Sequence, residues 1–189
     1  SKIKTIIMKL KFINYLFVIT LLFISCSDDD DAVSKEPLLG VYTISKSVLT
    51  SDAVSQNGAA SVASGTNVTA AIVTAFLSEI DCSSSADKGI EIAENNKIYF
   101  VCRLEGKQQD QGSWAINDAR TEFTLTLLIQ GNVVPLKLTG LQESSTKISG
   151  NVASIPVPPA LLASVNPLFG QVTDQAVLIS IDIELERLN

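Results

Sequence analysis

Residues 122–138 read EFTLTLLIQGNVVPLKL, and this stretch decides the fold class. Its first half alternates between polar residues on one face and apolar residues on the other, namely Phe123, Leu125, Leu127 and Ile129. Such alternation is typical of a strand that buries one face and exposes the other. Gly131-Asn132 then predicts a two-residue turn into a second strand at 133–138. The stretch therefore predicts an antiparallel hairpin.

The same period-two pattern recurs from residue 38 to the end of the chain. It is clearest at 177–185, where the residues predicted to point inward are Val177, Ile179, Ile181, Ile183 and Leu185. Other strands are predicted at 40–48, 89–93, 97–104, 112–116 and 147–155. About eight short antiparallel strands with turn residues between them favour a mostly β domain, either a sandwich or an up-and-down barrel.

Two insertions interrupt the strands. The first begins with a Ser/Ala/Gly-rich stretch at 51–65, predicted to be a mobile loop, and continues into a helix at 68–80. The second begins at Pro156-Val157-Pro158-Pro159 and predicts a short helix that carries Leu161, Leu162 and Val165 and stops at Asn166-Pro167. The apolar stripes of both helices predict covers for a barrel, with partner-binding sites as the alternative.

The first 25 residues have the three parts of an export signal. Lysines precede an apolar run at 12–24, and Ser25 lies just before Cys26. The run is shorter than the ~20 apolar residues of a spanning helix, although an N-terminal transmembrane anchor is the alternative. Met8 is the expected translation start, so residues 1–7 are expected to lie upstream of it.

Cys26 stands where a lipoprotein signal is cleaved, so we expect it to become the lipidated N-terminus of the mature chain. An acidic run follows at once, Ser27-Asp28-Asp29-Asp30-Asp31, within a polar segment that reaches Pro37. Such a run is typical of a flexible, self-repelling tether. It also resembles the signal that sends lipoproteins of Bacteroidetes-type bacteria to the outer face of the outer membrane. The expected domains are a signal peptide at 1–25, a lipidated tether at 26–37 and a barrel at 38–189.

Composition excludes several classes of function. The chain has 189 residues, of which 46% are apolar, and no histidine, the commonest general base and metal ligand. From Cys26 onward it holds ten basic and twenty acidic residues, a net charge of −10. That charge argues against binding to nucleic acid or anionic lipid head groups. No cofactor, metal or catalytic residue is predicted.

Once Cys26 carries lipid, Cys82 and Cys102 remain as an even pair in an oxidising compartment. The segment between them contains the strand predicted at 89–93, so a bridge is sterically reasonable. The alternatives are two unpaired core residues or a metal site, but two thiols without histidine do not complete a zinc site. We predict a disulfide.

Several short motifs resemble one family. Residues 38–44, with Gly40 and Tyr42, resemble the opening Gly-x-aromatic strand of lipocalin-like domains. The body of lipocalin-like lipoproteins from Bacteroidetes-type bacteria is similar to residues 81–82, 98–102, 112–117 and 123–125. The resemblance covers roughly residues 38–142 and implies a small barrel, with no established activity for most members. The chain departs from the family pattern at Tyr42, where Trp is common, and in its two insertions.

Gly112 and Trp114 each have a structural interpretation that does not depend on the family resemblance. Gly112 would let its strand approach a neighbouring backbone, and Trp114 would anchor the barrel floor, with ligand stacking as the alternative.

Three functions are open at this point. The first is a lipid-anchored, surface-exposed lipocalin-like module that binds a small apolar ligand inside the barrel. The second is an accessory outer-membrane lipoprotein with a filled barrel that acts through a protein partner. The third, an enzyme that pairs Asp81 with Glu91 or Glu105, is disfavoured because nothing in the sequence places these acids together.

Overall fold

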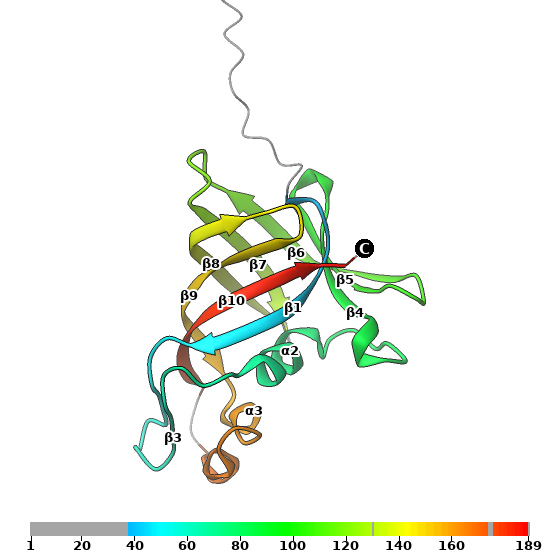
Figure 1. The fold of residues 1–189 in the computed structure, drawn as a ribbon. Helices are drawn as coiled ribbons and strands as arrows, with labels where there is room; N and C mark the ends of the chain where they lie inside the picture. The colour runs from blue at the N-terminus through cyan, green and yellow to red at the C-terminus, as the bar shows by residue number, and fades with distance from the viewer. Residues whose placement is uncertain (1–37, 130, 174–175, 189) are drawn as a thin grey trace, which may run out of the picture. The chain divides into compact units, whose positions relative to one another are not determined.

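The computed structural model describes residues 38–129, 131–173 and 176–188. Eight antiparallel strands of these residues form a closed barrel in the order β1-β10-β9-β8-β7-β6-β5-β4 (Figure 1). The chain winds up and down around the barrel, and β1 closes it by pairing with both β4 and β10. The strands are β1 (Gly40–Leu49), β4 (Lys88–Ile92), β5 (Lys97–Cys102), β6 (Lys107–Ile116), β7 (Glu122–Ile129), β8 (Asn132–Glu143), β9 (Lys147–Val157) and β10 (Val177–Arg187). The predicted eight-stranded, mostly β barrel with short helices is confirmed.

The alternating patterns place one face of each strand in the barrel interior. In β10 the five residues predicted to point inward are at most 7% exposed. In β7 the predicted inward residues Phe123, Leu125 and Leu127 are at most 3% exposed, and Ile129 is partly buried. Burial of these aliphatic and aromatic side chains, each contributing about 1.5–3 kcal/mol, is the main source of the barrel's stability.

Strand lengths and turns differ from the prediction at several places. Strand β6 begins five residues earlier than predicted, and β8 continues to Glu143. Strand β5 ends at Cys102 and not at the predicted Leu104, which lies in the following turn and is 83% exposed. Asn132 already pairs with Ile129, so the β7–β8 turn lies one residue earlier than Gly131-Asn132. The first half of β6, residues 107–111, has no alternation of polar and apolar residues, because neither of its faces is apolar. Its strand could therefore not be predicted from the pattern.

The stretch predicted to be a mobile loop at 51–65 is instead a small hairpin of β2 (Ala53–Val54) and β3 (Ser61–Val62). The Ser55 hydroxyl accepts a hydrogen bond from the Ala60 N–H at 2.9 Å and closes the turn. Ala53, Ala60 and Val62 are at most 5% exposed and pack against the core, whereas most of the other small residues of the stretch are exposed. The prediction failed because small residues can be buried without a periodic apolar pattern.

Helix α2 (Thr69–Leu77) follows, shorter than the predicted 68–80. Its predicted stripe is buried, comprising Val68, Ile72, Phe76 and Ile80. The helix is joined to β1 at its start, where the Ser47 N–H donates to the Thr69 hydroxyl at 2.8 Å. At its end the Lys88 ammonium donates to the Leu77 carbonyl at 2.8 Å, which satisfies a free helix carbonyl.

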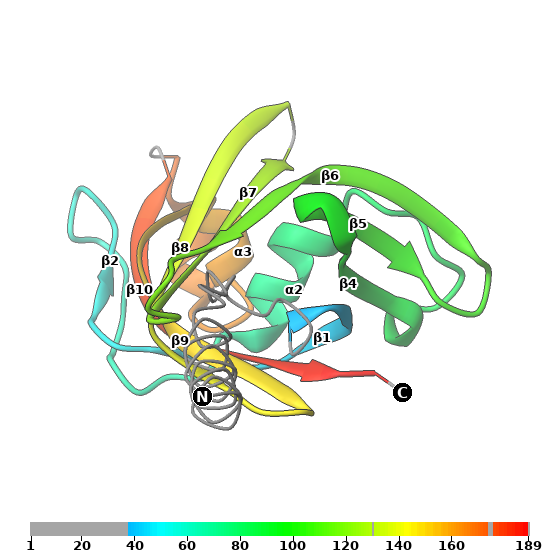
Figure 2. The same cartoon turned by 90° about the horizontal axis from the view of Figure 1, so that it is seen from above.

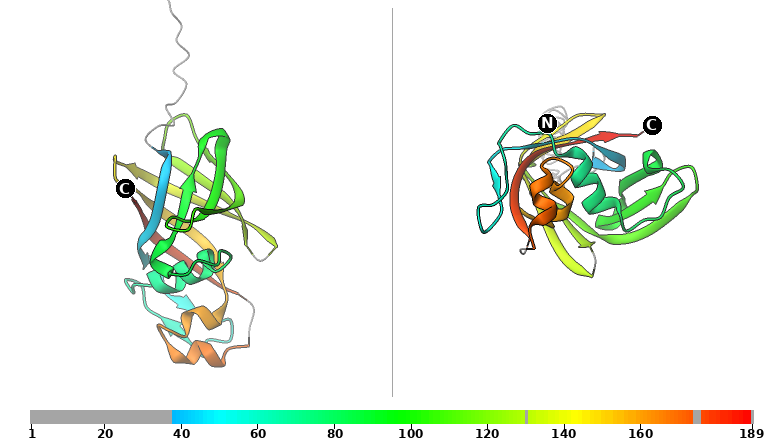
Figure 3. Two further views of the ribbon diagram at one scale, coloured as in Figure 1. Left: turned by 90° about the vertical axis from the view of Figure 1, so that its right-hand side faces the viewer. Right: turned by 90° about the horizontal axis from the view of Figure 1, so that it is seen from below.

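Helix α3 (Pro159–Leu162) and the 3₁₀ turn η4 (Pro167–Gln171) form the second insertion. Pro156 and Val157 belong to β9 and not to the helix, and Val165 lies beyond its end. Figure 3 shows α2, α3 and η4 gathered at one end of the barrel. Two further 3₁₀ turns, η2 (Ser85–Asp87) and η3 (Glu94–Asn96), flank β4.

Several barrel strands are paired on one side only over part of their length, among them β6 and β8. In the described residues, β6 pairs with β7 only from Gly112 onward, and β8 pairs with β9 only from Leu138 onward. The turn end of the β7–β8 hairpin therefore projects from the barrel wall (Figure 2). The Gln111 side-chain amide donates to the Leu128 carbonyl on one side of this hairpin, and Pro135 lies on the other.

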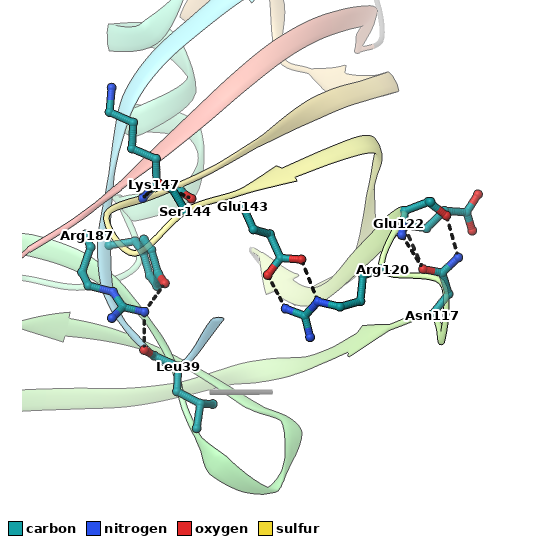
Figure 4. Close-up of polar contacts among 10 residues, drawn as sticks. Leu39, Asn117, Arg120, Glu122, Glu143, Ser144, Lys147 and Arg187 are labelled. Carbon is teal, nitrogen blue, oxygen red and sulfur yellow. Dashed lines mark hydrogen bonds and ion pairs between the residues drawn. The ribbon is translucent and has the colours of Figure 1, made fainter. Parts of the chain in front are cut away.

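The end of β10 is bound to the start of β1 through Arg187. Its guanidinium donates to the Leu39 carbonyl and to the Tyr42 hydroxyl, both at 2.8 Å, and lies 5.4 Å from the centre of the Tyr42 ring (Figure 4). Tyr42 is fully buried. The aromatic residue at the start of the first strand therefore has a structural role in closing the barrel.

Candidate functional site

The barrel interior is the first candidate site, since the sequence predicts an apolar cavity or a filled core there. The inward side chains of several strands are fully buried, including Phe100, Phe123, Ile148 and Ile181. Side chains that line an empty cavity keep part of their surface exposed to it, and these keep none. An eight-stranded barrel is only just wide enough to be filled by side chains or to hold one small ligand. The four side chains named here leave no exposed surface that would face a cavity.

The helices extend this core at one end of the barrel. Leu162 of α3 and Phe169 of η4 are fully buried in the same cluster as Ile72 of α2. The predicted covers are thus part of the core.

Trp114 and Gly112 lie side by side on β6. Trp114 is 2% exposed, its indole N–H donates to the Ala93 carbonyl at 2.9 Å, and its ring centre lies 5.9 Å from that of Phe123. A Cβ on Gly112 would lie 1.9 Å from the Thr126 carbonyl oxygen. Trp114 is therefore a core anchor, and Gly112 allows the close approach of β6 to β7. Gly112 was predicted to begin its strand, but it lies inside β6.

Cys82 and Cys102 are joined by a disulfide with their Cα atoms 5.5 Å apart. Cys102 is fully buried at the end of β5, on the same face as Ile98 and Phe100. The bond fixes the segment after α2 to the barrel wall.

Of the three acids considered for catalysis, Glu91 is engaged apart from the others, whereas Lys107 links the Glu105 carboxylate to the backbone of Asp81. Glu91 accepts a hydrogen bond from the Gln108 amide at 2.8 Å, and Glu105 pairs with Lys107 at 2.6 Å. The Lys107 ammonium also donates to the Asp81 carbonyl at 3.0 Å. Hydrogen bonds from Lys107 and from the Ser83 N–H lower the pKa of Glu105 to about 2, so this group is ionised at neutral pH.

We expect the Glu105 carboxylate to titrate near pH 2 and not near its ordinary value of 4.5. Replacing Lys107 with Met removes the main cause and should raise the pKa toward 4.5. A lowered pKa means that the stabilising interaction is present above pH 4.5 and is lost as pH falls toward 2. Carbon-13 NMR titration of the side-chain carboxyl measures both values, and a midpoint near 4.5 in the unmodified protein would contradict the expectation.

A second candidate site lies on the outer wall of the barrel, where β8, β9 and β10 adjoin. Two cross-strand rows of polar side chains are in register there: Thr139, Asn151 and Asp182 in one, and Gln142, Ser149 and Glu184 in the other. We call this surface the outer groove. It consists of adjoining depressions of about 350, 260 and 230 Å³, and Ser149 lines all three.

Two glycines line the largest depression of the outer groove, Gly140 on β8 and Gly150 on β9. Gly140, with φ +62°, lies where the β8–β9 register shifts between Thr139 and Gln142. A Cβ on Gly150 would lie 3.0 Å from the Thr139 carbonyl oxygen, so the backbones of β8 and β9 are in close contact. The same Cβ would also lie 3.2 Å from the Leu138 side chain, so the space left free at Gly150 is on the core side of β9.

The polar side chains of the outer groove are held in place by hydrogen bonds. The Asn151 amide donates to the Ile181 carbonyl and to one Asp182 carboxylate oxygen, each at 3.2 Å. Glu184 Oε1 accepts from the Lys147 ammonium at 2.9 Å and from the Ser45 hydroxyl at 3.0 Å. Lys147 and then Ser45 lower the pKa of Glu184, which keeps the carboxylate ionised.

The sequence analysis missed the outer groove because its residues are ordinary outward-facing polar residues. Isolated glycines within strands, as at 140 and 150, were the available signal, since they often mark bulges or close backbone approach.

The predicted lipidation site Cys26 and the predicted export signal, Ser27 and Asp28 to Asp31, lie outside the described residues. In the described ranges no group of three or more His, Cys, Asp or Glu side chains is placed to hold a metal ion. No helix in the same ranges is long and apolar enough to cross a membrane. Comparison with protein-family models, with curated proteins and with solved structures found no match.

Proposed function

We propose that the protein is a lipid-anchored accessory lipoprotein of the outer membrane, displayed on the cell surface, whose filled barrel acts through a protein partner. The packing of the interior supports this proposal over the binding of an apolar ligand. Phe100 of β5, Phe123 of β7 and Phe169 of η4 are fully buried, which supports an interior occupied by the protein's own side chains. A barrel filled in this way serves as a rigid scaffold, and binding then falls to its outer surface.

The anchor in this proposal rests on the sequence before residue 38. Cys26 follows an apolar run and precedes four aspartates, the arrangement expected of a lipidated and exported chain. The acidic run agrees with the resemblance to surface lipoproteins of Bacteroidetes-type bacteria.

Lipidation is tested by metabolic labelling with a fatty-acid probe in a bacterial host. We expect the unmodified protein to be labelled and Cys26→Ser to lose all label, because the thiol at the cleavage site is the acceptor. The Cys82→Ala/Cys102→Ala variant is the matched control and should keep its label. Equal labelling of the unmodified protein and Cys26→Ser would refute the anchor.

The filled barrel is tested by titration with a panel of fatty acids and an environment-sensitive apolar dye, following the fluorescence of Trp114. Trp114 is the only tryptophan and contacts the core, so a ligand in the interior should change its emission. We expect no saturable change below the concentration at which micelles form.

A Phe123→Ala variant is the positive control for this titration, since the cavity it opens should bind small apolar compounds such as benzene. Saturable binding of one fatty acid per unmodified chain would overturn the filled-barrel proposal and support the apolar-ligand carrier instead.

A further inference from the structure

We infer that the outer groove binds a neutral, hydroxyl-rich small molecule with the chemistry of a mono- or disaccharide. This goes beyond the proposed accessory function, because it requires neither the lipid anchor nor a protein partner. It rests on the position, spacing and charge of the polar side chains on β8, β9 and β10.

The two rows of the outer groove form a regular grid of hydrogen-bonding groups. Adjacent strands lie about 4.8 Å apart, so each three-strand row spans about 10 Å, and neighbouring positions on one strand face are about 7 Å apart. The largest depression, about 350 Å³, is within the ordinary size range of small-molecule sites. A grid of this size matches one or two sugar rings, whose hydroxyls project in several directions.

The chemistry of the grid suits hydroxyl groups. In the described residues, one carboxylate oxygen of Asp182 and one of Glu184 accept no hydrogen bond and are open to a donor. The Gln142 amide supplies both a donor and an acceptor, and the Ser149 hydroxyl does the same. A hydroxyl both donates and accepts, so it can pair with each of these groups. The internal hydrogen bonds of Asn151 and Glu184 hold the grid in position before a ligand arrives.

Charge favours a neutral ligand. Asp182 and Glu184 line the outer groove together with Lys46 and Lys147, so the two charge signs balance. Glu143 at one end is paired with Arg120 (Figure 4). An anion would meet the carboxylates in the centre of the groove, and a cation would meet the two ammonium groups beside it.

The inference is tested with the full-length chain in a detergent without sugar head groups, by nitrogen-15 NMR titration with a panel of saccharides. The neutral probes are glucose, galactose, mannose, N-acetylglucosamine and their disaccharides, and the charged probe is galacturonic acid. We expect at least one neutral probe to shift the amide signals of Ser149 and Asn151 saturably, with a dissociation constant on the order of 1 mM because the groove is open to water.

Two variants locate the site. Asp182→Asn is nearly isosteric and should raise the dissociation constant at least about tenfold by weakening a charge-assisted hydrogen bond. Ser149→Leu fills the centre of the outer groove and should abolish saturable binding. Thr124→Leu, the same kind of change at an outward position of β7, is the control and should bind as the unmodified protein does.

The inference is overturned if no neutral saccharide causes saturable shifts, if galacturonic acid alone binds, or if Ser149→Leu binds as well as Thr124→Leu. Each result leaves the lipid-labelling and apolar-ligand tests unaffected, so the two proposals fail independently.

Discussion

Replacing Gly112 with alanine is expected to destabilise the barrel by more than about 4 kcal/mol. The backbone at Gly112 has φ +142°, which L-residues rarely adopt, and the new Cβ would lie 1.9 Å from the Thr126 carbonyl oxygen. That oxygen belongs to the backbone of β7, so relief of the clash requires β6 and β7 to separate. Trp114 lies two residues further along β6 and would move with it.

Urea unfolding followed by Trp114 fluorescence and circular dichroism measures the change in the free energy of unfolding. Gly106→Ala is the matched control, because Gly106 also has a positive φ, +63°, yet a Cβ there meets nothing within 4 Å. It should cost only about 1 kcal/mol. Equal effects at the two positions would show that backbone conformation, and not the contact with Thr126, makes Gly112 necessary.

Removal of the disulfide by the Cys82→Ala/Cys102→Ala double substitution is expected to lower the free energy of unfolding by about 3 kcal/mol. The bond closes a loop with a sequence separation of 20, which restricts the unfolded chain. It also fixes the segment between α2 and β4 to the end of β5. Alanine is preferred to serine because Cys102 is fully buried and a hydroxyl there would lose hydrogen bonds to water.

Urea unfolding of the unmodified protein with and without a reductant provides the comparison. Reduction should destabilise the unmodified protein by a similar amount and leave the double variant unchanged. Mass spectrometry of the unreduced protein should find the peptides of Cys82 and Cys102 linked. Two freely alkylated thiols, or a reductant that has no effect on the unmodified protein, would contradict the prediction.

The barrel could be predicted from the sequence because burial of one strand face produces a readable alternation. In β10 all five predicted inward residues are buried, and in β7 the alternation holds as far as Leu127. Trp114 and Gly112 were predictable for related reasons, since a large aromatic residue and a strand glycine have few alternative roles.

Other features could not be predicted because they depend on partners distant in the sequence. The first half of β6 is polar on both faces and is held by its pairing with β5. The β2–β3 hairpin buries only Ala53, Ala60 and Val62 against the core, too few residues to form a periodic pattern. In the outer groove, the rows from Thr139 to Asp182 and from Gln142 to Glu184 exist only once the register of three strands is set.

The projecting end of the β7–β8 hairpin matters for strand pairing between copies of the protein at high concentration. A strand paired on one side only offers free backbone groups to any strand that meets it, which is a common route to aggregation. Here Pro135 removes an N–H donor from β8, and the Gln111 amide occupies the Leu128 carbonyl of β7. Both features reduce the number of free backbone groups that this hairpin offers to a strand of another copy.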